Sequence, residues 1–204
     1  MATESRTGRP RASSREVLSE AACELFLERG YDATSVSDIT RRAGVSRSSF
    51  FNYFSAKSDV LWSGLDARVD SAVTELRGGG DVRDVLRAIG DGLAPDALAL
   101  AIVNADAMGI GAELDRDRAI RQFRLQRETA ARLVRDGAAP LGAQVRAGAL
   151  AAAVLAAVWA WADHTAGRSL TETLSEALAT AGARATPSRG NASPPARFGR
   201  PRRP

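Results

Sequence analysis

The order of apolar and polar residues predicts helices along almost the whole chain. Apolar side chains recur at spacings of three and four residues, which gathers them on one face of a helix, whereas the strict alternation of a strand is nearly absent. Short stretches rich in glycine, proline or aspartate interrupt this pattern, and each should end one helix before the next begins. The sequence therefore predicts an all-α protein.

Three helices are predicted in the first sixty residues. The first covers residues 13–29, with Ser13 or Ser14 as its cap and a glycine after its last residue. Ser35 and the aspartate three residues later form a capping-box-like pattern that begins the second helix, which Gly44 ends. Ser46 then caps a third helix, at residues 47–54, that is very short.

The remaining helices are longer, and the breaks between them are the segments "GGG", "APD", "GIG", "DGAAP" and "AGR". Their predicted ranges are 57–77, 81–91, 95–107, 113–136, 140–166 and 169–182. We therefore expect a small N-terminal domain, a larger helical one and two terminal extensions. The expected parts are a flexible basic arm at 1–12, a DNA-binding domain at 13–61, an effector-binding and dimerisation domain at 62–182, and a disordered basic tail at 183–204.

The net charge of +4 and the isoelectric point near 10.1 are set mainly by the C-terminal tail. Residues 183–204 hold six arginines and no acid, so residues 1–182 carry 22 basic against 24 acidic groups. Basic residues without acids also gather at 41–57. Local clustering, more than the total charge, therefore points to a polyanionic partner.

Other features narrow the class of protein. A single cysteine, Cys23, allows no intramolecular disulfide and favours a reducing compartment; we expect it to be a small buried helix residue. We find no signal peptide, and the apolar run at 149–162 is too short to span a bilayer. A cytoplasmic protein with no membrane partner is expected.

The stretch "AGVSRSSFFNYFSAKSDVL" at 43–61 carries the candidate chemistry. A helix, a glycine-containing turn and a second short helix form a helix-turn-helix, whose later helix enters the DNA major groove. Small serines at the start of that helix let the backbone approach phosphates, and Arg47 adds a long donor. Phe50 and Phe54 should face the core, while Phe51, Asn52 and Tyr53 face outward.

At this point the sequence resembles the N-terminal DNA-binding domain of the TetR/AcrR family of bacterial repressors, over residues 14–61. The resemblance rests on several motifs at the correct spacing. The matching residues are Leu25-Phe26, Gly30-Tyr31, Ser35-Val36 with Ile39, Ala43 to Ser46, Phe51 with Tyr53-Phe54, and Lys57 with Val60-Leu61. The family's pattern implies the same two-domain, all-helical organisation.

The resemblance also implies individual roles. Ser35, Tyr53 and Lys57 match positions that touch phosphates. The residues that match family positions on the side facing the DNA groove, and that we expect to contact bases, are Arg47, Ser48, Ser49, Phe51 and Asn52. Ser48 stands for the family's usual glycine, Ser49 for threonine and Phe51 for tyrosine, which removes a hydroxyl but leaves a ring that can pack on a thymine methyl.

Packing is the alternative role for several of these side chains. Phe51 and Tyr53 can serve the core instead of DNA, and Arg41 and Arg42 can lie at a solvated helix end instead of on phosphate. The basic arm and tail can either add salt-sensitive affinity for the DNA backbone or simply keep the chain in solution.

The larger part carries no motif, as expected for a variable sensing domain. In the family this part binds a small molecule between its helices and forms a homodimer through its last two long helices, which here implies residues 140–182. Alanines and Gly148 permit close helix approach, although a core helix within one subunit is the alternative. The pocket candidates, each of which can equally be a packing residue, are Trp62, Met108, Phe123, Trp159, Trp161 and His164.

The stretch "KSDVLWSGLDARV" is similar to that of mycofactocin-type regulators, a branch associated with acyl-CoA effectors. The predicted function is therefore a repressor that a small molecule, hydrophobic or acyl-CoA-like, releases from a pseudo-palindromic duplex operator. A DNA-binding regulator without an effector and a protein-interaction bundle are the alternatives. One histidine, one cysteine and no catalytic or metal-ligand spacing argue against an enzyme, a metal site or a cofactor.

Overall fold

The computed structural model describes residues 14–163 and 167–182, and within these ranges every regular element is an α-helix, which confirms the predicted fold class. The predicted arm and tail, the candidate cap Ser13 and the candidate pocket residue His164 lie outside the described residues. The helices are α1 Ser14–Arg29, α2 Val36–Ala43, α3 Arg47–Tyr53, α4 Asp59–Gly78, α5 Val82–Ala88, α6 Ala97–Val103, α7 Ala105–Met108, α8 Gly111–Arg135, α9 Pro140–Asp163 and α10 Leu170–Gly182.

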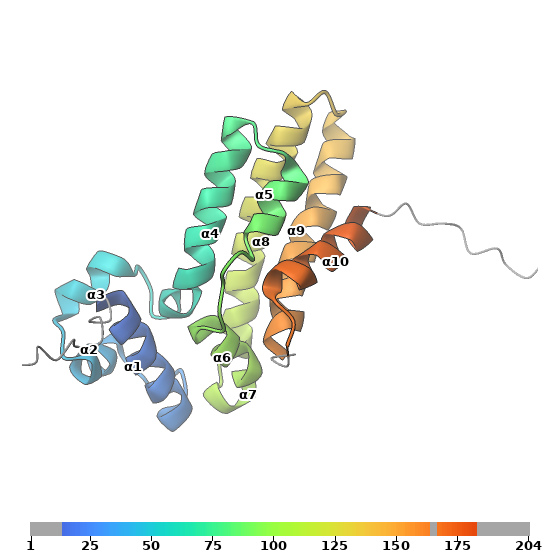
Figure 1. Cartoon of the computed structure of the whole chain (residues 1–204). Helices are drawn as coiled ribbons and strands as arrows, with labels where there is room; N and C mark the ends of the chain where they lie inside the picture. Colours follow the sequence, from blue (N-terminus) through green and yellow to red (C-terminus); the bar gives the residue numbers. More distant parts are fainter. Residues whose placement is uncertain (1–13, 164–166, 183–204) are drawn as a thin grey trace, which may run out of the picture.

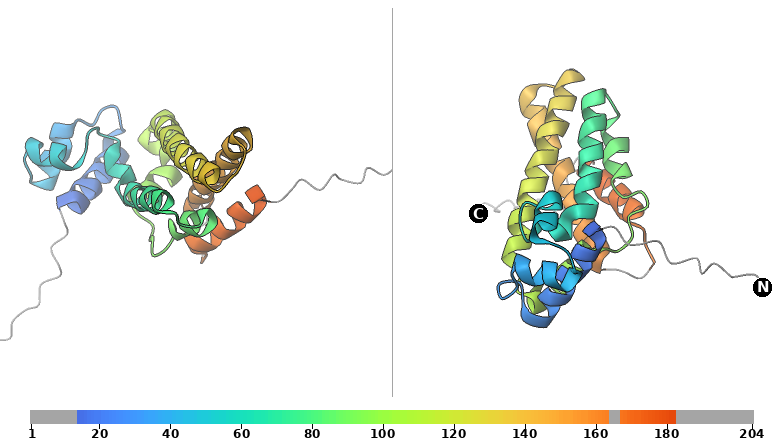
Figure 2. Two further views of the ribbon diagram at one scale, coloured as in Figure 1. Left: turned by 90° about the horizontal axis from the view of Figure 1, so that it is seen from above. Right: turned by 90° about the vertical axis from the view of Figure 1, so that its left-hand side faces the viewer.

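Helices α1 to α3 form a small group at one side of the molecule, and the longer helices α4, α8 and α9 stand side by side in a bundle (Figures 1 and 2). Helix α10 packs across α9 and α5, and α1 contacts α4, α6 and α7. Helix α4 is continuous across the predicted domain boundary at 61/62. The division at that position stays a prediction, and the two parts share a helix.

The predicted helix at 95–107 is wrong in one respect, because it is two helices in the structure. Asp96 caps α6, whose course ends at Asn104 with φ −108° and ψ 23°. The Asn104 side-chain amide donates to the Leu100 carbonyl at 2.8 Å, a local bond that competes with continued helix. The short helix α7 follows and ends at Gly109 in the left-handed conformation.

The apolar run at 149–162, by itself too short to span a bilayer, lies within helix α9, which over its 24 residues is apolar enough to cross a membrane by length and composition alone. Half of its apolar window is buried against neighbouring helices, chiefly α8 and α10. Core packing therefore accounts for about half of this apolar window.

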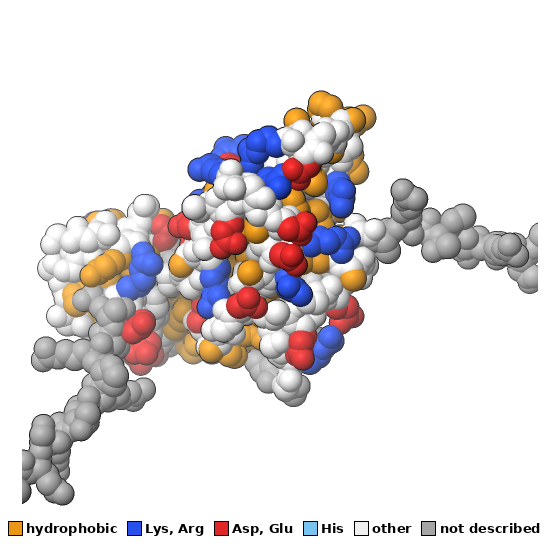
Figure 3. Space-filling model, turned by 45° about the horizontal axis from the view of Figure 1, so that its top comes forward, with side chains coloured by type: hydrophobic (Ala, Val, Ile, Leu, Met, Phe, Trp, Pro, Cys, Tyr) orange, Lys and Arg blue, Asp and Glu red, His pale blue; other side chains and the backbone are white. Residues whose placement is uncertain are grey.

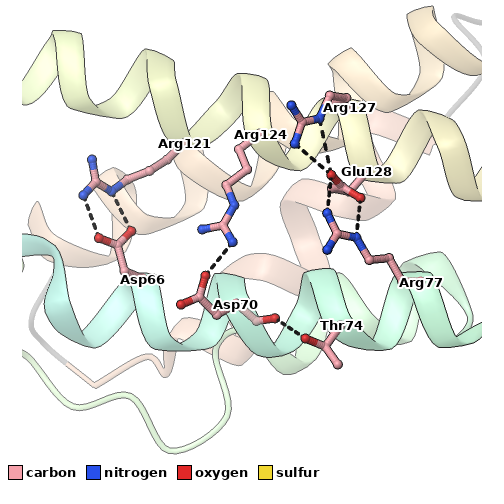
Figure 4. Close-up of polar contacts among 8 residues, drawn as sticks. All are labelled: Asp66, Asp70, Thr74, Arg77, Arg121, Arg124, Arg127 and Glu128. Carbon is pink, nitrogen blue, oxygen red and sulfur yellow. Dashed lines mark hydrogen bonds and ion pairs between the residues drawn. The ribbon is translucent and has the colours of Figure 1, made fainter.

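A ladder of ion pairs joins α4 to α8 (Figure 4). Arg121 donates through Nε and Nη2 to the two carboxylate oxygens of Asp66, each at 2.7 Å, and Arg124 lies 2.6 Å from Asp70. At the next step Arg77 donates twice to Glu128, each at 2.9 Å. Bidentate pairs fix direction as well as distance, so α4 is held in register with α8.

Two arginines of α8 continue this ladder to the end of α4. Arg132 donates to the Gly79 carbonyl at 2.8 Å, and Arg135 donates to the Leu76 carbonyl at 2.8 Å. These carbonyls belong to the last turn and cap of α4, where helical partners run out. On the outer face of the bundle basic and acidic side chains are interspersed (Figure 3), as expected where most charges are paired.

Candidate nucleic-acid interface

Ser35 begins α2 through a complete capping box. Its hydroxyl accepts from the Asp38 backbone N–H at 3.2 Å, and the Asp38 carboxylate accepts from the Ser35 backbone N–H at 3.0 Å and from its hydroxyl at 2.5 Å. These bonds, led by the hydroxyl, lower the pKa of Asp38. The predicted N-cap is confirmed. Because the Ser35 hydroxyl takes part in this cap, a contact between Ser35 and a DNA phosphate would share or replace one of these hydrogen bonds.

The turn between α2 and α3 needs a glycine at position 44. Gly44 has φ 68° and ψ 28°, and its N–H returns to carbonyls of the last turn of α2. Side chains with a Cβ rarely adopt this conformation, whereas glycine does so at little cost. The chain then reverses directly into Ser46 and α3.

Three serines form a connected group at the N-terminus of α3. The Ser46 hydroxyl accepts from the Ser49 N–H at 3.1 Å and lies 2.8 Å from the Ser48 hydroxyl and 2.9 Å from that of Ser49. All three lie at or near the surface. Their hydroxyls can turn to donate to an approaching oxygen, and the helix N-terminus favours negative charge there.

The aromatic residues of α3 divide between core and surface as predicted. Phe50 and Phe54 are buried and their rings lie 5.3 Å apart, whereas Phe51 is 50% exposed and Tyr53 43% exposed. Asn52 between them is exposed as well. The outer side of α3 therefore presents a ring, an amide and a phenol hydroxyl to a partner.

Lys57 has a structural role that the sequence reading missed. Its ammonium donates to the Tyr31 carbonyl at 2.6 Å and to the Thr34 carbonyl at 2.9 Å, and it lies 3.7 Å from the centre of the Tyr31 ring. Burial lowers its pKa, against the opposing effects of Asp32 and Glu113. Lys57 therefore holds the loop before α2, and a phosphate would have to use its third N–H.

Arg42 also has a structural role, because its ion pairs join two helices. It lies 2.9 Å from Glu24 and 2.7 Å from Glu28, so it ties α2 to α1, while Arg41 pairs with Asp38 at 3.1 Å and remains exposed. The pKa of Glu28 is lowered by its hydrogen bonds from Arg42. Glu24 and Glu28 are four residues apart on one helix face, and this spacing was the signal that could have predicted the pairing.

The charged side chain on α3 itself, Arg47, is positive and exposed. Residues 41–57 contain no acid, and within the described ranges Arg47 makes no ion pair; its guanidinium lies 5.7 Å from the centre of the Phe51 ring. An exposed, acid-free helix with one long donor and several hydroxyls is suited to phosphates and base edges. We name the group Arg47, Ser48, Ser49, Phe51, Asn52 and Tyr53 the α3 face.

The candidate pocket residues that the structure describes differ in their surroundings. Trp62 and Met108 are fully buried, Trp62 packs against Trp159 with ring centres 5.9 Å apart, and Phe123 points to the surface with 64% exposure. Trp161 is buried in α9. Packing explains the tryptophans and Met108, and a role for any of them in binding an effector stays a prediction.

The fold and the α3 face define the class of helix-turn-helix proteins that carry a larger helical domain. Residues 18–61 match the family described as "Bacterial regulatory proteins, tetR family". The N-terminal part of the chain, residues 18–61, is therefore a TetR-family domain.

Two curated relatives illustrate the similarity. The putative mycofactocin biosynthesis transcriptional regulator MftR of Mycobacterium tuberculosis is 34% identical over 91 residues, 43% of this chain and 46% of that protein. The HTH-type transcriptional activator FasR of Mycolicibacterium smegmatis is 39% identical over 68 residues, 33% of this chain and 31% of that protein. The chain thus matches less than half the length of these curated relatives.

A solved structure extends the likeness beyond the first domain. The repressor FadR of Thermus thermophilus, crystallised with lauroyl-CoA, is 26% identical with a TM-score of 0.50, and the match covers 82% of this chain and 92% of that one. The larger helical domain therefore has the same general arrangement as that of a TetR-family repressor.

Proposed function

We propose that this protein is a DNA-binding transcriptional regulator that a small molecule controls, and that it acts as a repressor on a pseudo-palindromic operator. The observation that carries the proposal is the α3 face, which is exposed and acid-free and begins with hydroxyls and Arg47. Such a helix reads base edges while its surroundings bind phosphate. Such a regulator acts in the cytoplasm, with the operator as its macromolecular partner.

A homodimer through α9 and α10 completes the proposal. The outer side of α9 exposes Leu141 at 78% and Val145 at 68%, and it continues into a groove of about 590 Å³ between α9 and α10 that small side chains line, among them Ala153, Ala156 and Ala177. Small residues allow a second helix pair to approach closely, and a two-fold axis would make the contact self-complementary. Two α3 faces would then meet successive major-groove segments about 34 Å apart.

The dimer is tested by one substitution on this side of α9. Ala156→Glu places a charge in the proposed contact and should give a monomer in sedimentation velocity, with weaker operator binding. Ala112→Glu, on the exposed start of α8, is the matched control and should leave the dimer intact. If Ala156→Glu sediments as wild type does, the interface lies elsewhere.

Operator binding is tested by selection of duplex fragments at about 150 mM salt, followed by footprinting. The proposal expects a pseudo-palindrome with half-sites one helical turn apart. Binding that is independent of sequence and lost on moderate addition of salt would contradict it, since backbone charge alone produces that behaviour.

Control by a small molecule is a separate part of the proposal, and a DNA-binding regulator without an effector is the second candidate. The structure of the FadR relative holds lauroyl-CoA, which favours a hydrophobic or acyl-CoA-like effector here. The relative FasR is named an activator, so binding to the operator can also raise transcription. Release of the footprinted duplex by acyl-CoA would support the repressor form of the proposal, while operator binding that no metabolite alters would favour the second candidate.

A further inference from the structure

A wide groove lies between α1 and the helices of the bundle. It has a volume of about 940 Å³, and its walls come from α1, the start of α4, the segment before α6, α6 itself and the end of α9. This volume lies within the range of small-molecule sites. Of the pocket candidates that the structure describes, none lines it.

The walls of this groove, which we call the α1–α6 groove, are mainly apolar. Leu27 on α1 and Leu100 and Val103 on α6 leave large apolar side chains exposed at its edge. Cys23 lies deeper, and burial first, then Asp96 and Glu24, raise the pKa of its thiol to about 12. The thiol thus stays protonated and serves as an apolar wall. An exposed apolar strip that bridges two helices suits the body of an amphipathic molecule.

The charged side chains among the described lining residues are mostly acidic. Where the structure describes the lining, Arg15 is its one basic side chain, and it lies beside the rings of Tyr53 and Phe54. Five acidic residues line the same groove: Glu16, Glu20, Glu24, Asp96 and Asp163. Glu24 pairs with Arg42 and Glu16 has an interaction of its own, so the charges that favour a cation over an anion are those of Glu20, Asp96 and Asp163.

Asp96 is the acidic group that the fold positions most firmly. Its Oδ1 accepts from the backbone N–H groups of Leu98 at 3.0 Å and Ala99 at 3.3 Å, so it caps α6. Its Oδ2 lies against Gly64 on α4, and a Cβ at that glycine would collide with it. Burial raises the pKa of this carboxyl, against those backbone bonds. The carboxylate is therefore fixed between α4 and α6, at the groove wall.

We propose that the α1–α6 groove binds a cationic amphipathic small molecule, with its apolar body along Leu27, Leu100 and Val103 and its positive group beside Asp96. Such an occupant touches α1 of the DNA-binding part and α6 and α9 of the bundle at once. Binding therefore favours one separation of these two parts, which is the requirement for coupling to DNA affinity. The coupling to DNA affinity rests on the proposed function, whereas the binding of the cation does not.

The test is calorimetric titration of the full-length protein, without DNA, with decyltrimethylammonium far below its micellar concentration. Decyl sulfate and decyl maltoside carry the same chain with an anionic and a neutral head. We expect one saturable site per chain for the ammonium compound and binding weaker by at least roughly tenfold for the other two. Equal binding of all three compounds would overturn the proposal, because apolar contact with the groove wall alone would then account for the affinity.

Variants locate the site. Asp96→Asn keeps an acceptor for the α6 cap and removes the charge, and it should weaken ammonium binding by roughly tenfold. Val103→Arg places a cation at the exposed edge and should abolish binding, while Asp115→Asn, an exposed acid on α8 outside the groove, should change nothing. Wild-type affinity in both groove variants would place the cation elsewhere and overturn the proposal.

The arginine-containing segment 1–12 is the competing occupant, and a synthetic peptide of that sequence tests it. Saturable binding of this peptide in place of the small cation would overturn the proposal. A protein that binds the ammonium compound and selects no operator would contradict the proposed function alone, so the two failures are distinguishable.

Discussion

The α3 face and the contact between α4 and α8 both depend on arginine, but they use it in opposite ways. All seven arginines of α8 are engaged inside the molecule, by carboxylates, by carbonyls or, for Arg118, by the Trp159 ring at 4.4 Å. Arg47 on α3 contacts only the neighbouring Phe51 ring among the described residues. The number of basic residues therefore says little about partners, whereas their pairing state separates an internal brace from a surface open to a polyanion.

The largest effect is expected when a buried phenylalanine of α3 is replaced by alanine and the loss of stability is compared with that of the same change at an exposed phenylalanine. Phe50 is fully buried between Phe51 and Phe54, so Phe50→Ala should lower the free energy of unfolding by about 3–5 kcal/mol through lost burial and a cavity. Urea unfolding followed by circular dichroism measures this loss.

Phe51→Ala is the matched control for that measurement. Since half of this side chain is exposed, we expect a loss of at most about 1 kcal/mol, together with weaker operator binding. An equal loss of stability in the two variants would show that Phe51 belongs to the core and would remove it from the α3 face.

The brace between α4 and α8 is tested at Glu128, which accepts from Arg77 and Arg127. Those arginines, Arg77 first, lower the pKa of Glu128 to about 2. Glu128→Gln should cost about 1–3 kcal/mol of unfolding free energy at pH 7, because two guanidinium groups lose their charged acceptor.

The pH dependence of this cost has a definite sign. The folded pKa lies below the ordinary value of 4.5, so the stabilisation is complete above about pH 4.5 and is lost as pH falls towards about 2. The difference in urea midpoint between wild type and Glu128→Gln should therefore shrink over that window. A difference that stays constant would mean that the pair does not depress this pKa.

A smaller loss of stability is expected from a substitution in the turn between α2 and α3. Gly44→Ala meets no atom within 4 Å but must adopt φ near +68°, which should cost about 1 kcal/mol. Gly78→Ala, in the last turn of α4 with equally open space, should be neutral or stabilise by up to about 1 kcal/mol. Thermal unfolding of both variants compares them, and equal shifts would mean that backbone strain is not what selects glycine at position 44.

The sequence predicted those parts of the fold that local backbone chemistry sets. Ser35 with Asp38, Gly44 and Ser46 act within four residues of themselves, so the bounds of α2 and α3 were predictable. The break at Asn104 was missed because it depends on one side-chain bond competing with a helix of otherwise favourable composition.

Contacts between distant residues were not predictable in the same way. The α4–α8 ion pairs join residues 51 to 55 positions apart, and nothing local to Arg121 marks Asp66 as its partner. Lys57 was assigned to phosphate by position alone, while the folded loop places two carbonyls around it. The α1–α6 groove likewise exists only once the two parts of the chain are packed.

The central claim is that the α3 face binds an operator, and the most direct test is the affinity of Arg47→Ala for the selected duplex at about 150 mM salt. Arg116→Ala, whose arginine pairs with Glu113 on α8, is the control. The account predicts a loss of about 1–3 kcal/mol of binding free energy, with reduced discrimination against random duplex, for Arg47→Ala and none for Arg116→Ala. Wild-type affinity and selectivity in Arg47→Ala would contradict the account.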